Sequence, residues 1–259
     1  MSKTRIHPTA IVSAQAHLAD GAEIGPYAIV SDHVHIGENT VIGSHAVINS
    51  FVRMGSNNQV HSHAVIGGLP QDLSFDPATE TWVEIGDGNI LREGVTIHRA
   101  TTPSAPTSLG SNGFLMAYVH LGHDCKVGNS VILTNNVGLA GHVEVGNNVV
   151  IGGHAVVHQF CRIGQFAMVA GFIAIRKDIM PFSMVAGESA RHYRLNTVGL
   201  RRSGIKGDRY QNLERAFRAV RSGDKSLEGI DNTEEIVYLR EWLAQHSKRG
   251  LGGFLHEKQ

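Results

Sequence analysis

The sequence has few cysteines, few aromatic residues and no excess charge of either sign. Its 259 residues include two cysteines, Cys125 and Cys161, and neither belongs to a paired-cysteine spacing that would bind zinc. Such sparing use of cysteine fits a reducing compartment. Lysine plus arginine number 23, as do aspartate plus glutamate, so no global field would attract nucleic acid. Aromatic residues make up 6%, which indicates a core of small stacked side chains.

Long apolar runs are absent as well. The first residues, MSKTRI, do not form the apolar core of a signal peptide. No uninterrupted apolar stretch is long enough to span a bilayer. We therefore expect a soluble, cytoplasmic protein.

The most prominent feature of the sequence is a repeat of aliphatic residues every six positions. Aliphatic residues recur at this spacing, often followed by glycine, in three runs: Ile6, Val12, Leu18, Ile24, Val30, Ile36, Ile42, Ile48, Met54, Val60 and Ile66; Ile85, Leu91 and Ile97; and every sixth position from Leu109 to Ile175. Neither an α-helix nor an ordinary amphipathic strand repeats every six residues. The period is typical of a hexapeptide-repeat parallel β-helix, in which three repeats close a triangular coil of about eighteen residues.

This pattern predicts a mainly β protein with two parts. Residues 1–187 would form the parallel β-helix, with loop insertions near 67–81 and 100–108 where the ladder is interrupted by proline, serine and threonine. These loops would carry function or be inert surface. Residues 188–259 would form a helical domain that caps the solenoid, with one helix carrying Tyr210, Leu213, Phe217 and Val220 behind an Asp208 N-cap, and another carrying Ile236, Leu239, Trp242 and Leu243.

The histidines of the central segment HLGHDC can be placed on this coil. Residues eighteen apart lie above one another, so His123, Gly141 and Gln159 form one line, with neighbours about 5 Å apart. Gly122, Ala140 and His158 form the next line, and His142 lies above Asp124. The result is a polar strip whose small residues leave room for a ligand.

This strip suits acyl transfer to a hydroxyl or an amine. A neutral imidazole at His123 can take the acceptor's proton, and Asp124 can fix its tautomer and stabilise the imidazolium. An amide N–H at Gly141 can donate to the tetrahedral oxyanion, an interaction worth roughly 3–4 kcal/mol. The acceptor can attack a thioester directly, so no serine or cysteine nucleophile is required.

Three other interpretations compete. A lone histidine on a corner is usually solvated surface, which we expect for His17, His33, His35, His45, His61 and His63, whereas His120, His123, His142 and His158 converge. A zinc hydratase of the γ-carbonic-anhydrase type, with three histidines shared across a subunit interface, is the metal alternative. A nucleophilic Cys125 is disfavoured because it lies two positions from His123.

The ordered blocks GLPQDLSF, REGVTIHRATT, HLGHDC, LAGHVEVG and VHQFCRIG resemble the acyl-[acyl-carrier-protein]–UDP-N-acetylglucosamine O-acyltransferases, over essentially the whole chain. The resemblance implies a left-handed β-helix, a hand that periodicity does not give. It also implies a homotrimer with active sites between neighbouring solenoids. An (R)-3-hydroxyacyl group would pass from the phosphopantetheine of acyl carrier protein to the 3-position of the sugar nucleotide, the first step of lipid A biosynthesis. No further cofactor, metal, nucleic acid or membrane insertion is expected.

The resemblance also assigns site residues. His123 would be the general base, Asp124 its partner and Gly141 the oxyanion donor. Gly171 would gate the acyl groove, and its lack of a side chain suggests that a fairly long chain is admitted. Positions that would contact the sugar, line the cleft or contact the nucleotide are Gln71, Asp72, His98, His120, His142, His158, Gln159, Asn196 and Arg202.

Four positions depart from the family pattern, and all lie among substrate contacts. Ser74 replaces a basic residue, Val198 an acidic one, Ser203 an arginine, and Ala100 the glycine that ends the usual IHRG block. The reaction class is unaffected, but the sugar nucleotide is left open, since some relatives acylate a 3-amino analogue to form an amide.

Two further functions stay open from the sequence. One is a different hexapeptide acyltransferase, such as a sugar N-acetyltransferase that uses acetyl-CoA. The other is a non-catalytic scaffold that binds acyl carrier protein. The arginines Arg191, Arg194, Arg201 and Arg202 would face the acidic carrier protein, bind nucleotide phosphate or simply be solvated.

Overall fold

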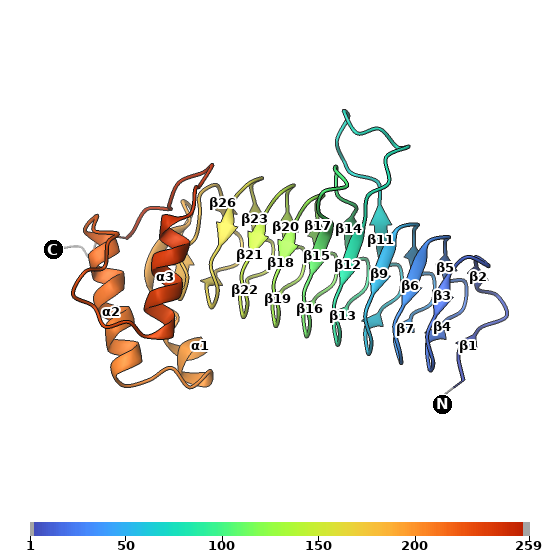
Figure 1. Cartoon of the computed structure of the whole chain (residues 1–259), viewed down its shortest axis with the longest axis horizontal. Helices are drawn as coiled ribbons and strands as arrows, with labels where there is room; N and C mark the ends of the chain where they lie inside the picture. Colours follow the sequence, from blue (N-terminus) through green and yellow to red (C-terminus); the bar gives the residue numbers. More distant parts are fainter. Residues whose placement is uncertain (1–2, 256–259) are drawn as a thin grey trace.

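The computed structural model describes residues 3–255, and most of this length is a stack of triangular coils (Figure 1). Its strands form three sheets, which we call A, B and C. Sheet A contains, in spatial order, β1 (Arg5–Ile6), β4 (Glu23–Ile24), β7 (Val41–Ile42), β10 (Gln59–Val60), β13 (Ile90–Leu91), β16 (Phe114–Leu115), β19 (Ile132–Leu133), β22 (Val150–Ile151), β25 (Met168–Val169), β27 (Ser183–Ala186) and β28 (Arg191–Leu195).

The other two sheets follow the same order along the stack. Sheet B contains β2 (Ile11–Val12), β5 (Ile29–Val30), β8 (Val47–Ile48), β11 (Val65–Gly68), β14 (Thr96–His98), β17 (His120–Leu121), β20 (Gly138–Leu139), β23 (Val156–Val157) and β26 (Ala174–Ile175). Sheet C contains β3 (His17–Leu18), β6 (Val34–Ile36), β9 (Val52–Met54), β12 (Val83–Ile85), β15 (Thr107–Leu109), β18 (Lys126–Val127), β21 (Glu144–Val145) and β24 (Arg162–Ile163).

The pairing is parallel and repeats every coil, as the ladder predicts. Leu121 pairs with Leu139, which pairs with Val157, so the aliphatic ladder stacks on itself. From Ile24 to Ile175 the ladder residues are at most 4% exposed. The first members lie at the open N-terminal end, where Ile6 is 49% exposed. The prediction of a mainly β, left-handed parallel β-helix is confirmed.

The turns between sheets follow one local rule. At most corners of a coil one residue has a positive φ. Asparagine, histidine or an aromatic residue usually occupies it, as at Asn39, His45 and Phe51, and an aspartate does so at Asp124. Asparagine and aspartate tolerate this conformation because their short polar side chains can hydrogen-bond locally. Here stacking between several of the corner rings adds support, as for His142 on Phe160 at 4.6 Å.

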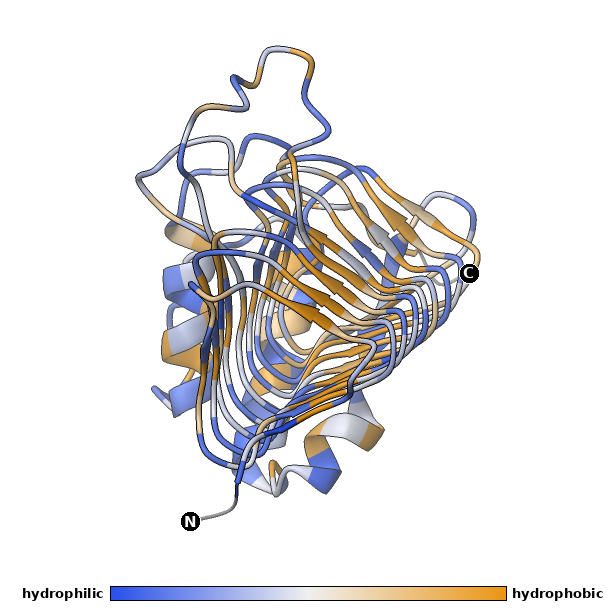
Figure 2. Cartoon of the chain, turned by 90° about the vertical axis from the view of Figure 1, so that its right-hand side faces the viewer, coloured by the Kyte–Doolittle hydropathy of each residue, from blue (hydrophilic) through white to orange (hydrophobic). Residues whose placement is uncertain are grey.

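The turns from sheet B to sheet C, which we call the B–C corner, carry both insertions. The first leaves after β11 and returns at β12, and the second connects β14 to β15. Viewed along the stack, both project from the same edge of the triangle (Figure 2). The loops therefore lie beside HLGHDC, which turns the same corner between β17 and β18.

The C-terminal part begins with a β-hairpin, which differs from the prediction. We expected residues from 188 onward to be helical, but β28 pairs antiparallel with β27 and extends sheet A. Three helices follow: α1 (Thr197–Arg202), α2 (Asp208–Arg221) and α3 (Glu234–Ala244). The expected apolar faces of α2 and α3 are buried, apart from the partly buried Tyr210 and Leu243. The prediction that Asp208 is the N-cap of α2 is wrong, because Gly207 occupies the N-cap position and Asp208 lies in the first turn.

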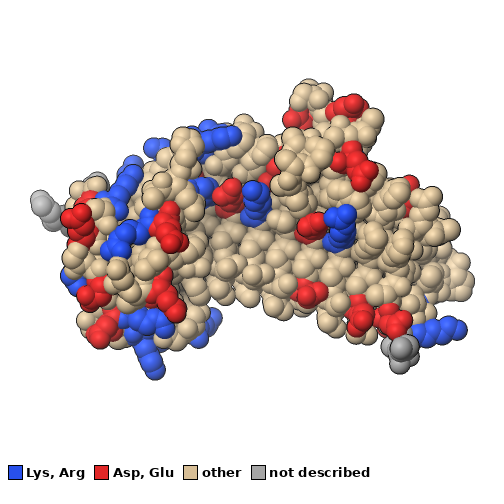
Figure 3. Space-filling model, viewed as in Figure 1, with Lys and Arg blue, Asp and Glu red and all other residues tan. Residues whose placement is uncertain are grey.

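The three outer faces differ in polarity. Side chains pointing out of sheet C are mostly charged or polar, as at Arg53, Glu84, Lys126, Glu144 and Arg162, whereas those of sheets A and B include exposed valine, isoleucine and methionine. Charged side chains crowd over the helical end and are sparser over the coils (Figure 3). Within the described residues, no helix is long and apolar enough to cross a membrane.

Candidate active site

His123 and Asp124 form a hydrogen-bonded pair at the B–C corner. His123 Nδ1 lies 2.7 Å from Asp124 Oδ2, and both side chains are largely buried. Burial acts to raise the pKa of the Asp124 carboxyl, but hydrogen bonds from His123 and Thr101 outweigh it and lower the pKa below its usual value. The carboxylate is therefore ionised at neutral pH, and Nδ1 is the donor. Nε2 is left as the proton acceptor.

The second loop holds the Asp124 carboxylate from the other side. The Thr101 backbone N–H donates to Oδ1 at 3.0 Å, and its hydroxyl donates to Oδ2 at 2.8 Å. Thr107 accepts the Asp124 backbone N–H at 2.7 Å. The loop from residue 100 to 108 is thus part of the support of this pair, and we exclude the interpretation of this loop as inert surface. Sequence reasoning missed Thr101, because its contact crosses a coil through an irregular loop.

Gly141 lies directly over the His123 ring, as the eighteen-residue spacing predicts. A Cβ at this position would be 2.4 Å from His123 Cε1 and 2.6 Å from Nε2, so no side chain fits while the imidazole stays in place. The Gly141 amide has no hydrogen-bond acceptor within residues 3–255. The residue that carries this unbonded N–H therefore packs against the proton-accepting edge of the imidazole, which makes it a candidate oxyanion donor.

His142 completes this cluster. Its Nε2 lies 3.5 Å from Asp124 Oδ2, and its ring meets His123 edge-on at 5.2 Å. Burial lowers the His142 pKa, although Asp124 acts in the opposite direction. A hollow of about 280 Å³ opens beside Asp124 and His142 and is walled by Thr102, Ser104 and Pro106. The donor atoms of His123, Asp124 and His142 lie within 4.8 Å of one another and are the described group best placed to hold a metal ion.

His120 and His98 are neighbours on sheet B. Their ring centroids are 5.1 Å apart, and His120 Nδ1 shares a hydrogen bond of 2.9 Å with the Thr96 hydroxyl. Burial, with smaller contributions from His98 and His123, lowers the His120 pKa to about 4. His120 is therefore neutral at physiological pH. His98 Nδ1 donates to the Leu69 carbonyl at 2.6 Å and ties down the first loop.

That loop brings Asp72 toward the histidine cluster. Asp72 accepts hydrogen bonds from the backbone and hydroxyl of Ser74, at 2.9 and 2.7 Å, which lower its pKa. The nearby His123 and His142 lower it further. Gln71 is exposed on the same loop. Ser74, the departure from the family's basic residue, thus orients the neighbouring carboxylate.

His158 and Gln159 lie higher on the same corner, where they are exposed and are contacted by the C-terminal segment. Arg249 Nε donates to the Gln159 carbonyl at 2.8 Å, and the Arg249 guanidinium also contacts the His158 ring. Lys248 lies 4.0 Å from the centroid of Phe160. Sequence reasoning missed Lys248 and Arg249, since nothing local shows that this segment returns to the coil.

Three expected site residues lie apart from this cluster. The Asn196 side chain donates to the Phe166 carbonyl at 2.9 Å and accepts the Gly199 N–H at 3.1 Å, so it caps α1. Arg202 is exposed in the last turn of α1. Both are near the turn from sheet C to sheet A, which we call the C–A corner. Gly171 lies between β25 and β26, where a Cβ would be 2.8 Å from the Gly153 carbonyl.

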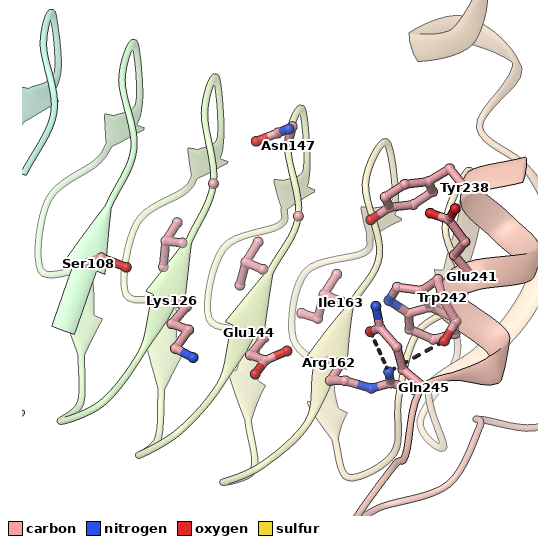
Figure 4. Close-up of a pocket in the computed structure, with 14 residues that line it drawn as sticks. Ser108, Lys126, Glu144, Asn147, Arg162, Ile163, Tyr238, Glu241, Trp242 and Gln245 are labelled. Atoms are coloured by element: carbon pink, nitrogen blue, oxygen red, sulfur yellow. Dashed lines mark hydrogen bonds between the residues drawn. The ribbon is translucent and has the colours of Figure 1, made fainter. Parts of the chain in front are cut away.

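A larger hollow than the one beside Asp124 lies elsewhere. It measures about 430 Å³ and lies between α3 and sheet C, lined by Lys126, Glu144, Arg162, Tyr238 and Trp242 among others (Figure 4). No candidate catalytic residue faces it. Cys125 is also unsuited to chemistry, because burial raises the pKa of its thiol to about 12. Both observations leave the B–C corner as the candidate reactive site.

Several known proteins are similar in sequence to this chain over nearly its full length. The curated acyl-[acyl-carrier-protein]–UDP-N-acetylglucosamine O-acyltransferase of Paraburkholderia phymatum is 42% identical over 262 residues, covering 96% of this chain and 99% of its own. The chain belongs to this acyltransferase family. The Paraburkholderia xenovorans enzyme of the same name is 47% identical over 239 residues, covering 92% of this chain and 89% of its own.

Family models and solved structures agree with this membership. Residues 178–251 match the model described as UDP N-acetylglucosamine O-acyltransferase, domain 2, and residues 33–68 match bacterial transferase hexapeptide repeats. The UDP-N-acetylglucosamine O-acyltransferase structure from Moraxella catarrhalis has a TM-score of 0.91 and 42% identity, and covers 95% of this chain and 99% of its own. The Acinetobacter baumannii structure has a TM-score of 0.90 and 37% identity, with 96% and 99% covered.

Proposed function

We propose that the protein transfers an (R)-3-hydroxyacyl chain from acyl carrier protein to the 3-hydroxyl of UDP-N-acetylglucosamine, the first step of lipid A biosynthesis. The observation that carries this proposal is the His123–Asp124 pair beneath the free Gly141 amide, in a chain of this family. The acyl donor brings its own phosphopantetheine, and the protein adds no cofactor. Carrier protein and sugar nucleotide meet in the cytoplasm, where we expect the enzyme to act.

The proposed mechanism uses both edges of the His123 imidazole. Nε2 removes the proton of the sugar hydroxyl as its oxygen attacks the thioester carbonyl carbon, and Nδ1–H stays bonded to the Asp124 carboxylate. The Gly141 N–H stabilises the oxyanion of the tetrahedral intermediate. The carbon–sulfur bond then breaks, and the imidazolium returns its proton to the leaving thiolate.

We propose that the working unit is a trimer whose subunits share each site. The exposed apolar residues of the coils concentrate on sheets A and B and on the turn between them: Ile11, Ile29, Val41, Val156 and Met168, with Tyr27, Tyr118 and Phe172 at the turn. Packing sheet A of one subunit on sheet B of the next buries these residues around a three-fold axis.

That arrangement brings two separated sets of site residues together. The B–C corner of one subunit, with His123, would then face the C–A corner of its neighbour, where Asn196 and Arg202 lie. Arg202 suits a nucleotide phosphate because its guanidinium can donate two parallel hydrogen bonds. Asn196 would act through the position of α1, which its side chain caps.

The substrates are tested by product formation with purified protein. Hydroxyacyl carrier proteins of several chain lengths are offered with UDP-N-acetylglucosamine or its 3-amino analogue, and acetyl-CoA serves as the control donor. We expect ester product from the carrier-bound donor and none from acetyl-CoA. Preference for the amino sugar would replace ester by amide formation, and activity only with acetyl-CoA would overturn the proposal.

A further inference from the structure

Arg99 is a buried cation at the base of the first loop. Arg99 follows β14 at the B–C corner and is 4% exposed. Its backbone N–H donates to the Gly68 carbonyl at 2.8 Å, which fixes it beside the start of the loop. The guanidinium lies 4.9 Å from the ring centroid of Phe51 and 6.0 Å from that of Phe75.

This guanidinium lacks an anionic partner in the described part of the chain. Its Nε is buried without a hydrogen-bond acceptor, and none of its nitrogens forms a hydrogen bond or an ion pair within residues 3–255. Glu80 acts on it only at longer range. The partly buried Arg162, by contrast, is paired with Asp178 at 2.8 Å. A buried charge is costly unless it is paired and hydrogen-bonded.

Arg99 lines a hollow that offers donors and no carboxylate. The hollow measures about 300 Å³, near the lower end of the range for small-molecule sites, and its other walls are Asn49, Ser50, Phe51, Gly67 and Leu69. Asn49 contributes an amide and Ser50 a hydroxyl, and the Ser50 hydroxyl at present donates to Asp32. No lining residue is shared with the hollow beside Asp124.

We propose that this hollow binds the oxyanion of a small organic ligand, a phosphate or carboxylate group held by the Arg99 guanidinium with Asn49 and Ser50 as further donors. A guanidinium can bind either group through two parallel hydrogen bonds. The site is separate from the proposed reaction and stands whether or not that reaction is correct. Because Arg99 also contacts Phe75, an occupied site would stiffen the loop that carries Gln71 and Asp72.

A purely structural role is the competing explanation. In that case Arg99 stacks on Phe51 and Phe75 to hold the loop base, and no anion binds. Direct binding measurements separate the two explanations, since stacking alone gives no saturable response to an added oxyanion.

The test titrates the purified full-length protein with inorganic phosphate, and separately with acetate, at constant ionic strength. Calorimetry gives the affinity, and Trp82 fluorescence gives a local signal because the Trp82 ring packs edge-on against Phe51 at 5.4 Å. We expect saturable binding of at least one of the two anions, weakened at least about tenfold in Arg99→Met. Arg218→Met, which alters an exposed arginine on α2, is the matched control and should bind as wild type.

A second variant keeps the test sharp if Arg99→Met fails to fold. Asn49→Asp places a carboxylate in the wall of the hollow, where it should pair with Arg99, raise the melting temperature and abolish anion binding. Absence of saturable binding to the wild type would overturn the proposal. Undiminished binding to a folded Arg99→Met, or to Asn49→Asp, would overturn it as well.

Discussion

At the scale of single residues, the site depends on one close approach between backbone and imidazole. Gly141 is required because any Cβ there would overlap the His123 ring, with contacts of 2.4 to 3.0 Å to three ring atoms. Gly141 is itself buried, and its amide N–H forms no hydrogen bond within residues 3–255. In the proposed mechanism, glycine at this position would therefore serve both the placement of the base and the stabilisation of the oxyanion.

Gly141→Ala should displace the His123 ring while leaving the coil intact. We expect turnover to fall by about a hundredfold or more, because the base and the oxyanion donor are disturbed together. The measurement is kcat with carrier-bound donor, alongside circular dichroism and melting temperature. Gly138→Ala, where a Cβ would meet only Val156 at an ordinary 3.7 Å, is the control. A Gly141→Ala enzyme within twofold of wild type would contradict this account.

The sequence is informative about these residues because they sit on a strict repeat. Counting eighteen residues from His123 reaches Gly141 and Gln159, and the structure stacks them in that order. Arg99, Thr101, Lys248 and Arg249 could not be placed in this way. Their contacts pass through irregular loops or join segments far apart in sequence, for which no period fixes the geometry.

At the scale of elements, the hairpin and the C-terminal segment are joined through one buried histidine. His192 on β28 is fully buried, its Nε2 accepts the Met180 N–H at 2.8 Å, and its Nδ1 donates to the Gly252 and Gly253 carbonyls at 3.1 Å. Burial lowers its pKa to about 4 despite these carbonyls. The neutral ring thus holds Gly252 and Gly253 against the hairpin.

Stability should therefore fall on acidification between pH 6.5 and about 4. In this window His192 is protonated in the unfolded chain but neutral in the folded chain. The free energy of unfolding therefore decreases by about 3 kcal/mol as pH falls. Urea unfolding at a series of pH values measures this loss. His120 contributes in the same direction and remains present in each variant.

His192→Gln isolates the contribution of His192. Glutamine can accept and donate hydrogen bonds, yet it does not titrate. The number of protons taken up on unfolding between pH 6.5 and about 4 should therefore be smaller by about one in the variant. His45→Gln, at an exposed corner, is the control. Identical pH dependence in His192→Gln and wild type would show that the buried ring is not responsible.

In the C-terminal part, the sequence pattern predicts two helices but not the strand that precedes them. The apolar spacing correctly predicted helices at Asp208–Arg221 and Glu234–Ala244. The apolar spacing did not reveal β28, because most side chains of Arg191–Leu195 are polar and exposed. This strand forms because it pairs with β27, and its own sequence has no clear apolar period. The nucleotide role of Asn196, which the family resemblance implies, stays a prediction; in the structure its side chain caps α1.

At the scale of the whole molecule, we propose that neighbouring subunits complete each site. One chain places His123 at the B–C corner and Arg202 near the C–A corner, on different edges of the triangle. A monomer would leave these residues apart. The apolar outer rows of sheets A and B are the surfaces that would bring them together.

Mixed trimers test this sharing of sites. His123→Ala and Arg202→Ala should each be poorly active alone. Co-expression with distinct tags should give mixed trimers that recover roughly a third of wild-type turnover, since one of the three sites in every mixed trimer pairs two intact corners. The tagged hetero-oligomers are isolated by sequential affinity steps and assayed directly. No recovery in trimers shown to contain both variants would place each site within one subunit.

The most direct test of the central claim is the turnover of His123→Ala with hydroxyacyl carrier protein and UDP-N-acetylglucosamine. We predict a loss of at least about a hundredfold in kcat, with the melting temperature and the oligomeric state unchanged, because the variant removes only the proton acceptor. Turnover equal to that of the wild type would contradict the assignment of His123 as the base.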